Sequence, residues 1–223
     1  MKKQVLVVGG TGLVGSFLLK FLASEMDFEV SALVRKPHSL ASLHSHIREI
    51  VFDYENSNHY KELSLKKFDF VFCCLGTTKK NAGSDAAFRR VDFEYPAAIL
   101  EAVKESRPVF SLVSSVGTNR PRGLYLTTKA RLEKSVFESG LVYVVARPSL
   151  LLGERKEFRF AEFLATKIFG GVENILRNCF GENIAKYAPI SACDAARALC
   201  VHAKQSAQTG KSTVLEGRAF FSL

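Results

Sequence analysis

The fold is decided near the start of the chain by Gln4-Val5-Leu6-Val7-Val8-Gly9-Gly10-Thr11-Gly12-Leu13-Val14-Gly15. This stretch begins with an apolar run of the kind that is buried on both faces of a parallel sheet. Closely spaced glycines follow, and residues 13–24 then show the apolar spacing of a helix. Glycines permit a tight turn, and a helix N-terminus presents unpaired N–H groups to an anion. The sequence therefore predicts a strand, a phosphate-binding turn and a helix.

The glycine spacing also satisfies the fingerprint of a dinucleotide-binding loop. In such a loop the backbone approaches a pyrophosphate closely, which side chains at the glycine positions would prevent. We expect cofactor contacts from this loop and from the first turn of the helix. The predicted contact residues are Gly9, Thr11, Gly12, Leu13, Val14 and Gly15.

Strand and helix patterns alternate along the rest of the first 148 residues. Strands are expected at 28–34, 47–52, 68–75, 109–113 and 141–146, and helices at 84–106 and 124–139. Pro96 should kink the first of these helices or mark a new first turn. Strands joined by long crossovers form βαβ units, so the predicted fold class is α/β with a Rossmann-type, doubly wound parallel sheet.

After Pro148 the pattern becomes less regular. Residues 160–170 and 191–204 have helical spacing, 212–215 suit a late strand, and 153–187 offer no residue with an assignable role. Because no linker or repeat interrupts the chain, we expect one domain over 1–223. Its cofactor core would span about 1–148 and a small substrate-side segment 149–223.

Composition excludes several classes of protein. No stretch approaches the roughly 20 apolar residues of a membrane span, so no membrane is expected. The net charge of +9 is spread along the chain and is not interleaved with aromatic residues, so nucleic acid is not expected either. Five cysteines without a Cys-x-x-Cys motif indicate a reducing compartment, and we expect a cytoplasmic protein. No histidine pairs with a cysteine at ligand spacing, so no metal is expected.

The residues after the strand at 28–34 indicate which nucleotide is bound. A carboxylate at this place would bind the 2′-hydroxyl of NAD, but Arg35 and Lys36 stand there instead. A guanidinium forks onto a 2′-phosphate, which an acid would repel. We therefore expect NADP(H) to be preferred over NAD(H), with Arg35 and Lys36 as contacts, although Lys36 also suits a solvated surface.

Two further groups follow strands at the same edge of the sheet. Asp53 comes after 47–52 and is either a hydrogen-bond acceptor for the adenine amino group or a solvated loop residue. Gly76, Thr77 and Thr78 come after 68–75. The glycine would let the backbone approach the cofactor, and the threonine hydroxyls are available as donors.

Tyr125 and Lys129 stand four residues apart on a predicted helix, so both project from one face. A positioned phenol can act as a general acid or base, and a nearby ammonium helps it to exchange a proton. Ser115, at the end of the strand at 109–113, can hydrogen-bond a substrate carbonyl, whereas Ser114 alternates to the opposite side. The predicted catalytic residues are Ser115, Tyr125 and Lys129, and beside a dinucleotide they indicate an oxidoreductase.

With these motifs in place, the chain resembles the short-chain dehydrogenase/reductase family, in particular its atypical, Tat-interacting-protein-like group. Residues 72–78, 88–92 and 124–136 carry this resemblance, 146–153 resemble the motif beside the nicotinamide, and 189–198 resemble a late helix entry. The resemblance implies a Rossmann fold, NADPH binding, the catalytic set named above, and Arg147 and Pro148 beside the cofactor. Asp92 stands where related extended enzymes usually carry asparagine.

Three functions are compatible with these residues. The leading one is an NADPH-dependent carbonyl reductase or related oxidoreductase with a small-molecule carbonyl or alcohol substrate. The second is an NADPH-binding regulator or scaffold that acts through a protein partner with little turnover. The third is a sugar-nucleotide epimerase or dehydratase. Substrate and reaction direction stay open, and a monomer or a homodimer is expected.

Overall fold

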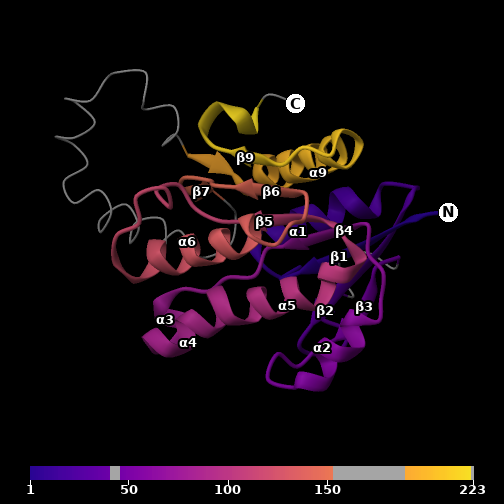
Figure 1. The fold of residues 1–223 in the computed structure, drawn as a ribbon, viewed down its shortest axis with the longest axis horizontal. Helices are drawn as coiled ribbons and strands as arrows, with labels where there is room; N and C mark the ends of the chain where they lie inside the picture. The colour runs from indigo at the N-terminus through magenta and orange to yellow at the C-terminus, as the bar shows by residue number, and fades with distance from the viewer. Residues whose placement is uncertain (41–45, 153–188, 222–223) are drawn as a thin grey trace.

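The computed structural model describes residues 1–40, 46–152 and 189–221. Within these ranges seven strands form one parallel sheet in the order β3-β2-β1-β4-β5-β6-β9 (Figure 1). The strands are β1 (Lys3–Val8), β2 (Phe28–Val34), β3 (Arg48–Val51), β4 (Phe70–Cys73), β5 (Val109–Val113), β6 (Tyr143–Ala146) and β9 (Thr213–Leu215). This order is that of a doubly wound Rossmann-type sheet, so the predicted α/β fold class is confirmed.

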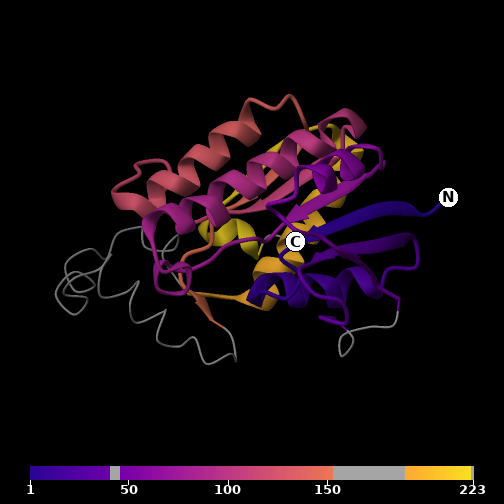
Figure 2. The same ribbon diagram turned by 90° about the horizontal axis from the view of Figure 1, so that it is seen from below.

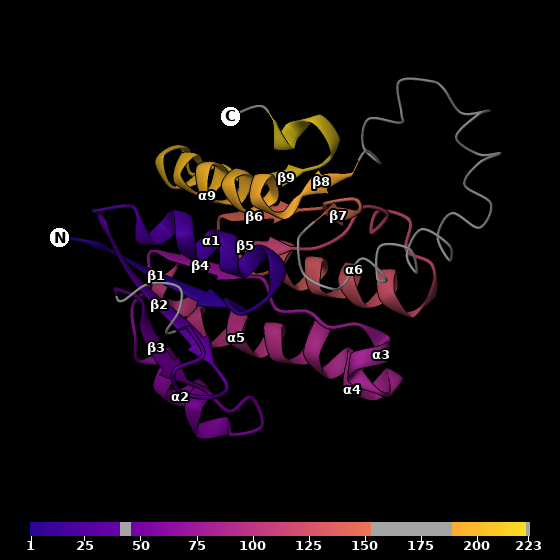
Figure 3. The ribbon, with the colours of Figure 1, turned by 180° about the vertical axis from the view of Figure 1, so that it is seen from behind.

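Helices cover both faces of the sheet. Figure 3 shows α1 (Leu13–Ala23) and α9 (Ala192–Thr209) on one side of the strands. On the other side lie α2 (Ser57–Ser64), α5 (Tyr95–Val103) and α6 (Gly123–Phe137). In the view of Figure 2, α5 and α6 run side by side across their face. Each face therefore has its own apolar core.

Strand β1 explains why both faces need cover. Val5 and Val7 belong to the core under α1 and α9, whereas Leu6 and Val8 belong to the opposite core. All four side chains are fully buried. Successive strand residues point to opposite faces, so an unbroken apolar run requires helices on both. The prediction that this strand is buried on both faces of a parallel sheet is confirmed.

The expected helix at 84–106 is present but changes character on the way. It begins as α4 (Asp85–Arg89), widens into a π-helical turn, η1 (Arg90–Glu94), continues as α5, and ends with a 3₁₀ turn, η2 (Lys104–Ser106). Pro96 has no N–H to give the carbonyl of Asp92, and its ring would clash with that carbonyl in a regular helix. The Tyr95 N–H instead bonds to the carbonyl of Arg90. Of the two expected outcomes, a kink at Pro96 or a new first turn, the structure shows the second, with Pro96 in the first turn of α5.

Some elements were not predicted because they are short or polar. In α2 the only buried residue is Leu63, and the helix starts at the side-chain cap of Asn56. The others are α3 (Lys79–Ala82), the paired strands β7 (Leu151–Leu152) and β8 (Ile190–Ser191), and the 3₁₀ turn η4 (Gly217–Phe220). The expected helix at 160–170 and the whole irregular segment 153–187 lie outside the described residues, and the single-domain organisation stays a prediction. Among the described helices, none is long and apolar enough to cross a membrane.

Candidate active site

The predicted site residues follow the carboxyl ends of the strands. Strand β1 lies between β2 and β4, so the connection from β1 leaves toward one side of the sheet and the chain later returns to the other. Ligands of open α/β sheets bind in the crevice at such a reversal point. The glycine turn follows β1 at this point and leads into α1.

The glycine turn is tightly built. Gly9 has φ of +81°, and its carbonyl accepts the Gly12 N–H at 3.0 Å. A Cβ on Gly9 would lie 2.8 Å from the backbone of Cys74, at the end of β4, and a Cβ on Gly15 would lie 2.3 Å from the Gly9 carbonyl oxygen. Neither position has room for a side chain. Backbone therefore packs directly against backbone in this turn.

The N-terminus of α1 suits an anion. Its first turn contains no acidic residue, so no carboxylate of that turn occupies the N–H groups. Thr11 is exposed and Leu13 is partly buried, whereas Val14 lies in the apolar core. Any contact from Val14 to a phosphate must therefore come from its backbone N–H. This arrangement is a cradle that a pyrophosphate fits.

The predicted nucleotide-selecting residues lie on neighbouring strands. Arg35 and Lys36 are exposed directly after β2, and Asp53 is exposed after β3, which pairs with β2. Asp53 sits in a turn in which its Oδ1 accepts the Glu55 N–H at 3.0 Å and its own N–H bonds to Nδ1 of His59 at 2.9 Å. The structure thus brings the two cations and the carboxylate to the same end of the sheet.

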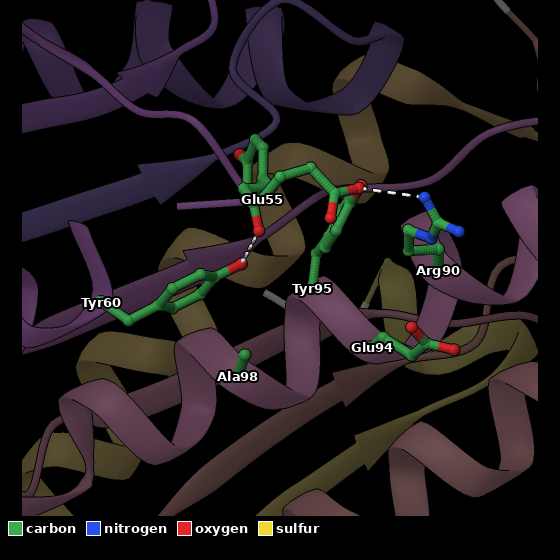
Figure 4. Close-up of a pocket in the computed structure, with 7 residues that line it drawn as sticks. Glu55, Tyr60, Arg90, Glu94, Tyr95 and Ala98 are labelled. Atoms are coloured by element: carbon green, nitrogen blue, oxygen red, sulfur yellow. Dashed lines mark hydrogen bonds and ion pairs between the residues drawn. The ribbon is translucent and has the colours of Figure 1, made fainter. Parts of the chain in front are cut away.

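Beside this end lies a pocket of about 430 Å³ that the sequence did not predict (Figure 4). The rings of Tyr54 and Tyr95 stack at 5.0 Å, and the Tyr60 hydroxyl donates to the carbonyl of Tyr54 at 3.0 Å. Glu55 accepts hydrogen bonds from Tyr95 and from Arg90. These groups satisfy one another and brace the loop of Asp53 against α5.

The catalytic candidates come from β5 and α6. Ser115 follows β5 and is buried, with its hydroxyl 3.3 Å from the carbonyl of Val116. Ser114 is buried as well, and its hydroxyl has no hydrogen-bond partner among the described residues. Tyr125 is partly buried on α6, its ring 6.1 Å from that of Phe88. Lys129 lies one turn further along the helix and is only 5% exposed.

Lys129 is held by a carboxylate that the sequence analysis did not place in the site. Its Nζ lies 2.9 Å from Oδ1 of Asp92, which belongs to η1 and is 1% exposed. The other oxygen, Oδ2, accepts the N–H of Thr77 at 2.8 Å. Burial alone would lower the pKa of Lys129, but Asp92, with contributions from Tyr125 and Cys73, raises it above the ordinary lysine value. The signal in the sequence was the aspartate where related enzymes carry asparagine.

The loop after β4 covers this ion pair. A Cβ on Gly76 would lie 3.3 Å from both Asp92 Oδ1 and Lys129 Nζ. The hydroxyl of Thr78 caps α3 by accepting the Asn81 N–H at 3.0 Å. Thr77 and Thr78 are thus used to shape the loop, while Gly76 leaves the backbone close to the buried charges.

Arg147 ends β6 as expected, but its guanidinium is bound by carboxylates. Nη2 lies 2.6 Å from Oε2 of Glu133 on α6, and Nη1 lies 2.9 Å from Oε1 of Glu216 after β9. Glu133 also accepts the hydroxyl of Thr118 at 2.8 Å. Pro148 accepts the Val116 N–H at 2.9 Å. Arg147 therefore joins elements around the site, and its cofactor contact and that of Pro148 stay predictions.

A family model and the most similar curated relatives point to the same family. A family model described as NAD(P)H-binding matches residues 9–171. The chain is 34% identical over 175 residues to Protein HTATIP2 of Rattus norvegicus, covering 76% of this chain and 72% of that protein. It is 30% identical over 195 residues to Protein FMP52, mitochondrial, of Candida albicans, covering 84% and 82%. Both relatives are atypical short-chain dehydrogenase/reductase-like NAD(P)-binding proteins.

Solved structures agree on the fold. MoeE5 in complex with UDP-glucose and NAD superposes with a TM-score of 0.69 at 21% identity, over 95% of this chain and 75% of that one. The ADP-L-glycero-D-manno-heptose-6-epimerase of Helicobacter pylori gives 0.70 at 18% identity, over 97% and 77%. At these identities the likeness concerns the Rossmann-type fold alone.

One expectation is overturned by the comparisons. The cysteine content indicated a cytoplasmic protein, but several FMP52 relatives are named mitochondrial. The expected location is wrong on this finding. Cysteine usage reports the redox state of a compartment, and it does not separate one reducing compartment from another.

Proposed function

We propose a function that follows from the family, since this chain belongs to the NAD(P)H-binding family of atypical short-chain dehydrogenase/reductase-like proteins. The protein is an NADP(H)-dependent oxidoreductase that interconverts a small carbonyl compound and its alcohol. The observation that carries the proposal is the placement of Lys129. Its buried ammonium lies under Gly76, one helical turn from Tyr125, at the sheet edge where the glycine turn offers a phosphate cradle.

The described residues fit a dinucleotide. Gly9 and Gly15 leave no side chain between the turn and a pyrophosphate, and the first turn of α1 carries no competing acid. At the far end of the edge, Arg35 is exposed among the described residues. We assign the 2′-phosphate of NADP(H) to this guanidinium, with Lys36 as a second cation and Asp53 near the adenine.

When bound, the nicotinamide cofactor supplies or accepts the hydride. The chain's own residues handle the substrate oxygen and its proton. Ser115 would donate a hydrogen bond that orients the carbonyl, and Tyr125 would give its hydroxyl proton to the carbonyl oxygen. The ammonium of Lys129 stabilises the negative charge left on Tyr125. In the reverse direction Tyr125 removes the proton of the alcohol.

A binding assay and a turnover assay test this proposal separately. Purified protein is titrated with NADPH and NADH, and is then supplied with a panel of aldehydes and ketones while NADPH absorbance is followed. We expect NADPH binding and consumption of NADPH with at least one carbonyl class. The Tyr125→Phe variant should bind NADPH normally and lose turnover. Binding without any turnover, equal in both proteins, would instead favour the regulator or scaffold acting through a protein partner.

We also propose that the protein works in mitochondria, by analogy with the FMP52 relatives named mitochondrial. The net charge of +9 is compatible with any compartment and decides nothing. Fractionation of cells that express the full-length protein with a C-terminal tag tests the location. Recovery in the cytosolic fraction alone would contradict it.

A further inference from the structure

A buried ion pair links two elements of the candidate site that lie far apart in the sequence. We propose that Asp92 is a positioning residue, which holds the ammonium of Lys129 beneath Gly76 and ties it to the loop that follows β4. This inference deepens the proposed function, because it concerns how the same site is assembled. It also makes a separate claim about the state of Lys129 in the protein without substrate.

Both carboxylate oxygens of Asp92 are committed. Oδ1 meets Lys129 Nζ at 2.9 Å, and Oδ2 accepts the Thr77 N–H at 2.8 Å. One side chain therefore joins η1, α6 and the loop after β4. An asparagine offers a single oxygen acceptor, so it cannot accept from both partners with separate oxygens. The aspartate is the residue type that can make both contacts.

The backbone of η1 explains how Asp92 occupies this place. Its helix widens into a π turn between Arg90 and Glu94, where the Tyr95 N–H bonds to the Arg90 carbonyl. Pro96 cannot donate to the carbonyl of Asp92, so a regular turn would leave that carbonyl without its helical partner. Short π-helical turns of this kind are frequent at functional sites. The buried carboxylate of Asp92 therefore belongs to the π-helical turn itself.

The loop after β4 lies so close to the Asp92–Lys129 ion pair that a side chain at position 76 would contact both charged groups. A Cβ at position 76 would lie 3.3 Å from Asp92 Oδ1 and equally from Lys129 Nζ. Gly76 itself is exposed, so its outer side faces solvent rather than the core. A cofactor lying against Gly76 would thus be separated from the ammonium by backbone alone. Because Asp92 contacts both Lys129 and the Thr77 N–H, a movement of Lys129 would also displace this loop.

The charges around Lys129 leave Asp92 as its counter-ion. The groups that act on the ammonium are Asp92 from η1, Tyr125 from its own helix, and the thiols of Cys73 and Cys74 at the end of β4. Burial raises the pKa of the Cys73 thiol to about 11, so that thiol is neutral near pH 7. With Asp92 replaced by a neutral residue, burial would act on Lys129 without its main counter-charge and favour loss of its proton. The positioning role therefore has a pH signature that packing alone would not have.

The experiment compares Asp92→Asn with a matched control, Glu133→Gln. Glu133 is the other buried carboxylate partner of a cation near α6, but its partner is Arg147. For each protein we would measure the NADPH dissociation constant and the pH profile of turnover between about pH 6.5 and pH 9.5. Melting temperature, measured in parallel, reports the stability that either substitution removes.

We expect wild-type affinity to stay level across this range. Asp92→Asn should match it closely at the acid end and lose at least about tenfold in affinity toward the alkaline end, the size of one charge-assisted hydrogen bond. Turnover should fall over the same pH interval. Glu133→Gln should melt at a lower temperature and keep the wild-type pH profile. A folded Asp92→Asn protein whose pH profile matches that of the wild type would overturn the inference.

A measurement on the wild-type protein covers the case in which Asp92→Asn does not fold. Lysine-selective ¹⁵N NMR, assigned with Lys129→Met, should show the Lys129 ammonium protonated at a pH where exposed lysines have begun to titrate. Titration of Lys129 together with the exposed lysines would contradict the inference. Neither the affinity profile nor the NMR requires turnover, so they decide the role of Asp92 even if no carbonyl compound proves to be a substrate.

Discussion

The side chain that Gly15 lacks would collide with Gly9. A Cβ at position 15 would lie 2.3 Å from the Gly9 carbonyl oxygen, while the same carbonyl accepts the Gly12 N–H at 3.0 Å. The two glycines thus close one turn of backbone between β1 and α1. Gly12 differs, because its φ of −76° suits any residue and its Cβ would lie 3.2 Å from Gly9.

Because Gly12 tolerates a side chain sterically and Gly15 does not, substitutions at these two positions test cofactor binding and folding separately. We expect Gly12→Val to fold, with modest adjustment of the turn, and to lose detectable NADPH binding, since the branched side chain would occupy the place of the pyrophosphate. Gly15→Ala should instead destabilise the protein by about 1–3 kcal/mol, as overpacking against backbone does. Thermal melting and NADPH titration of both variants check this. Normal NADPH affinity in folded Gly12→Val would remove the phosphate-cradle assignment.

Arg35 should set the preference for NADPH. The guanidinium is exposed after β2, where it can meet a 2′-phosphate, and a charge-assisted hydrogen bond of this kind contributes about 1.5–3 kcal/mol. Arg35→Ala should therefore weaken NADPH binding by roughly ten- to a hundredfold and leave NADH binding nearly unchanged. Lys36→Ala is the matched control, with a smaller effect. If calorimetric titration finds the ratio of the two affinities unaltered in Arg35→Ala, the assignment of Arg35 is wrong.

Removal of the Tyr125 hydroxyl and removal of the Lys129 ammonium should have different effects on binding, turnover and stability. Tyr125→Phe removes one oxygen from a partly buried ring, so fold and NADPH affinity should survive while turnover falls by at least about a hundredfold, the low end of general acid catalysis. Lys129→Ala should lose turnover, weaken NADPH binding and also unfold more easily. The last effect arises because Asp92 would be left buried without its counter-ion.

The stability loss of Lys129→Ala has its own control. The double variant Lys129→Met/Asp92→Asn removes both charges and should recover part of the lost stability, since an uncompensated buried charge costs more than a neutral pair. Denaturant unfolding of the two proteins measures this. Equal stability of Lys129→Ala and the double variant would mean that the ion pair has no energetic weight.

The ion pair of Arg147 and Glu133 should contribute more to the free energy of unfolding than an exposed ion pair does. Glu133 is buried, with its Oε2 2.6 Å from Nη2 of the partly buried Arg147, and its removal leaves Glu216 as the remaining carboxylate on that guanidinium. Glu133→Ala should reduce the free energy of unfolding by about 1–3 kcal/mol, because Arg147 loses one of its two carboxylates and the Thr118 hydroxyl loses its bond to Glu133. The exposed pair of Lys134 and Glu138 on the same helix is the control, and Glu138→Ala should change it by at most about 1 kcal/mol. Similar values for the two variants would contradict the burial argument.

The order of elements could be predicted because it is written in local patterns. The apolar run of β1, the glycine turn and the apolar stripe of α1 are each visible over a few residues. Tyr125 and Lys129 share a helix face by spacing alone. The polar helix α2 was not predicted because it buries only Leu63. The cysteine content indicated a reducing compartment and led to the wrong location.

Contacts between distant segments could not be predicted in this way. Asp92 and Lys129 meet only because η1 and α6 pack on the same face of the sheet, next to the loop that follows β4. Arg147 finds Glu216 only because β9 pairs with β6. The pocket beside Tyr54 likewise combines a loop, two helices and a π turn.

What the sequence by itself determined was therefore the list of elements, the glycine turn and the candidate catalytic side chains, since these depend on spacing along one segment. Only the tertiary structure decided which charges are buried and with which partner. The physical reason is that a charge enters the interior when a counter-charge from another element meets it there. For Lys129 that element is η1, and no pattern within α6 points to it.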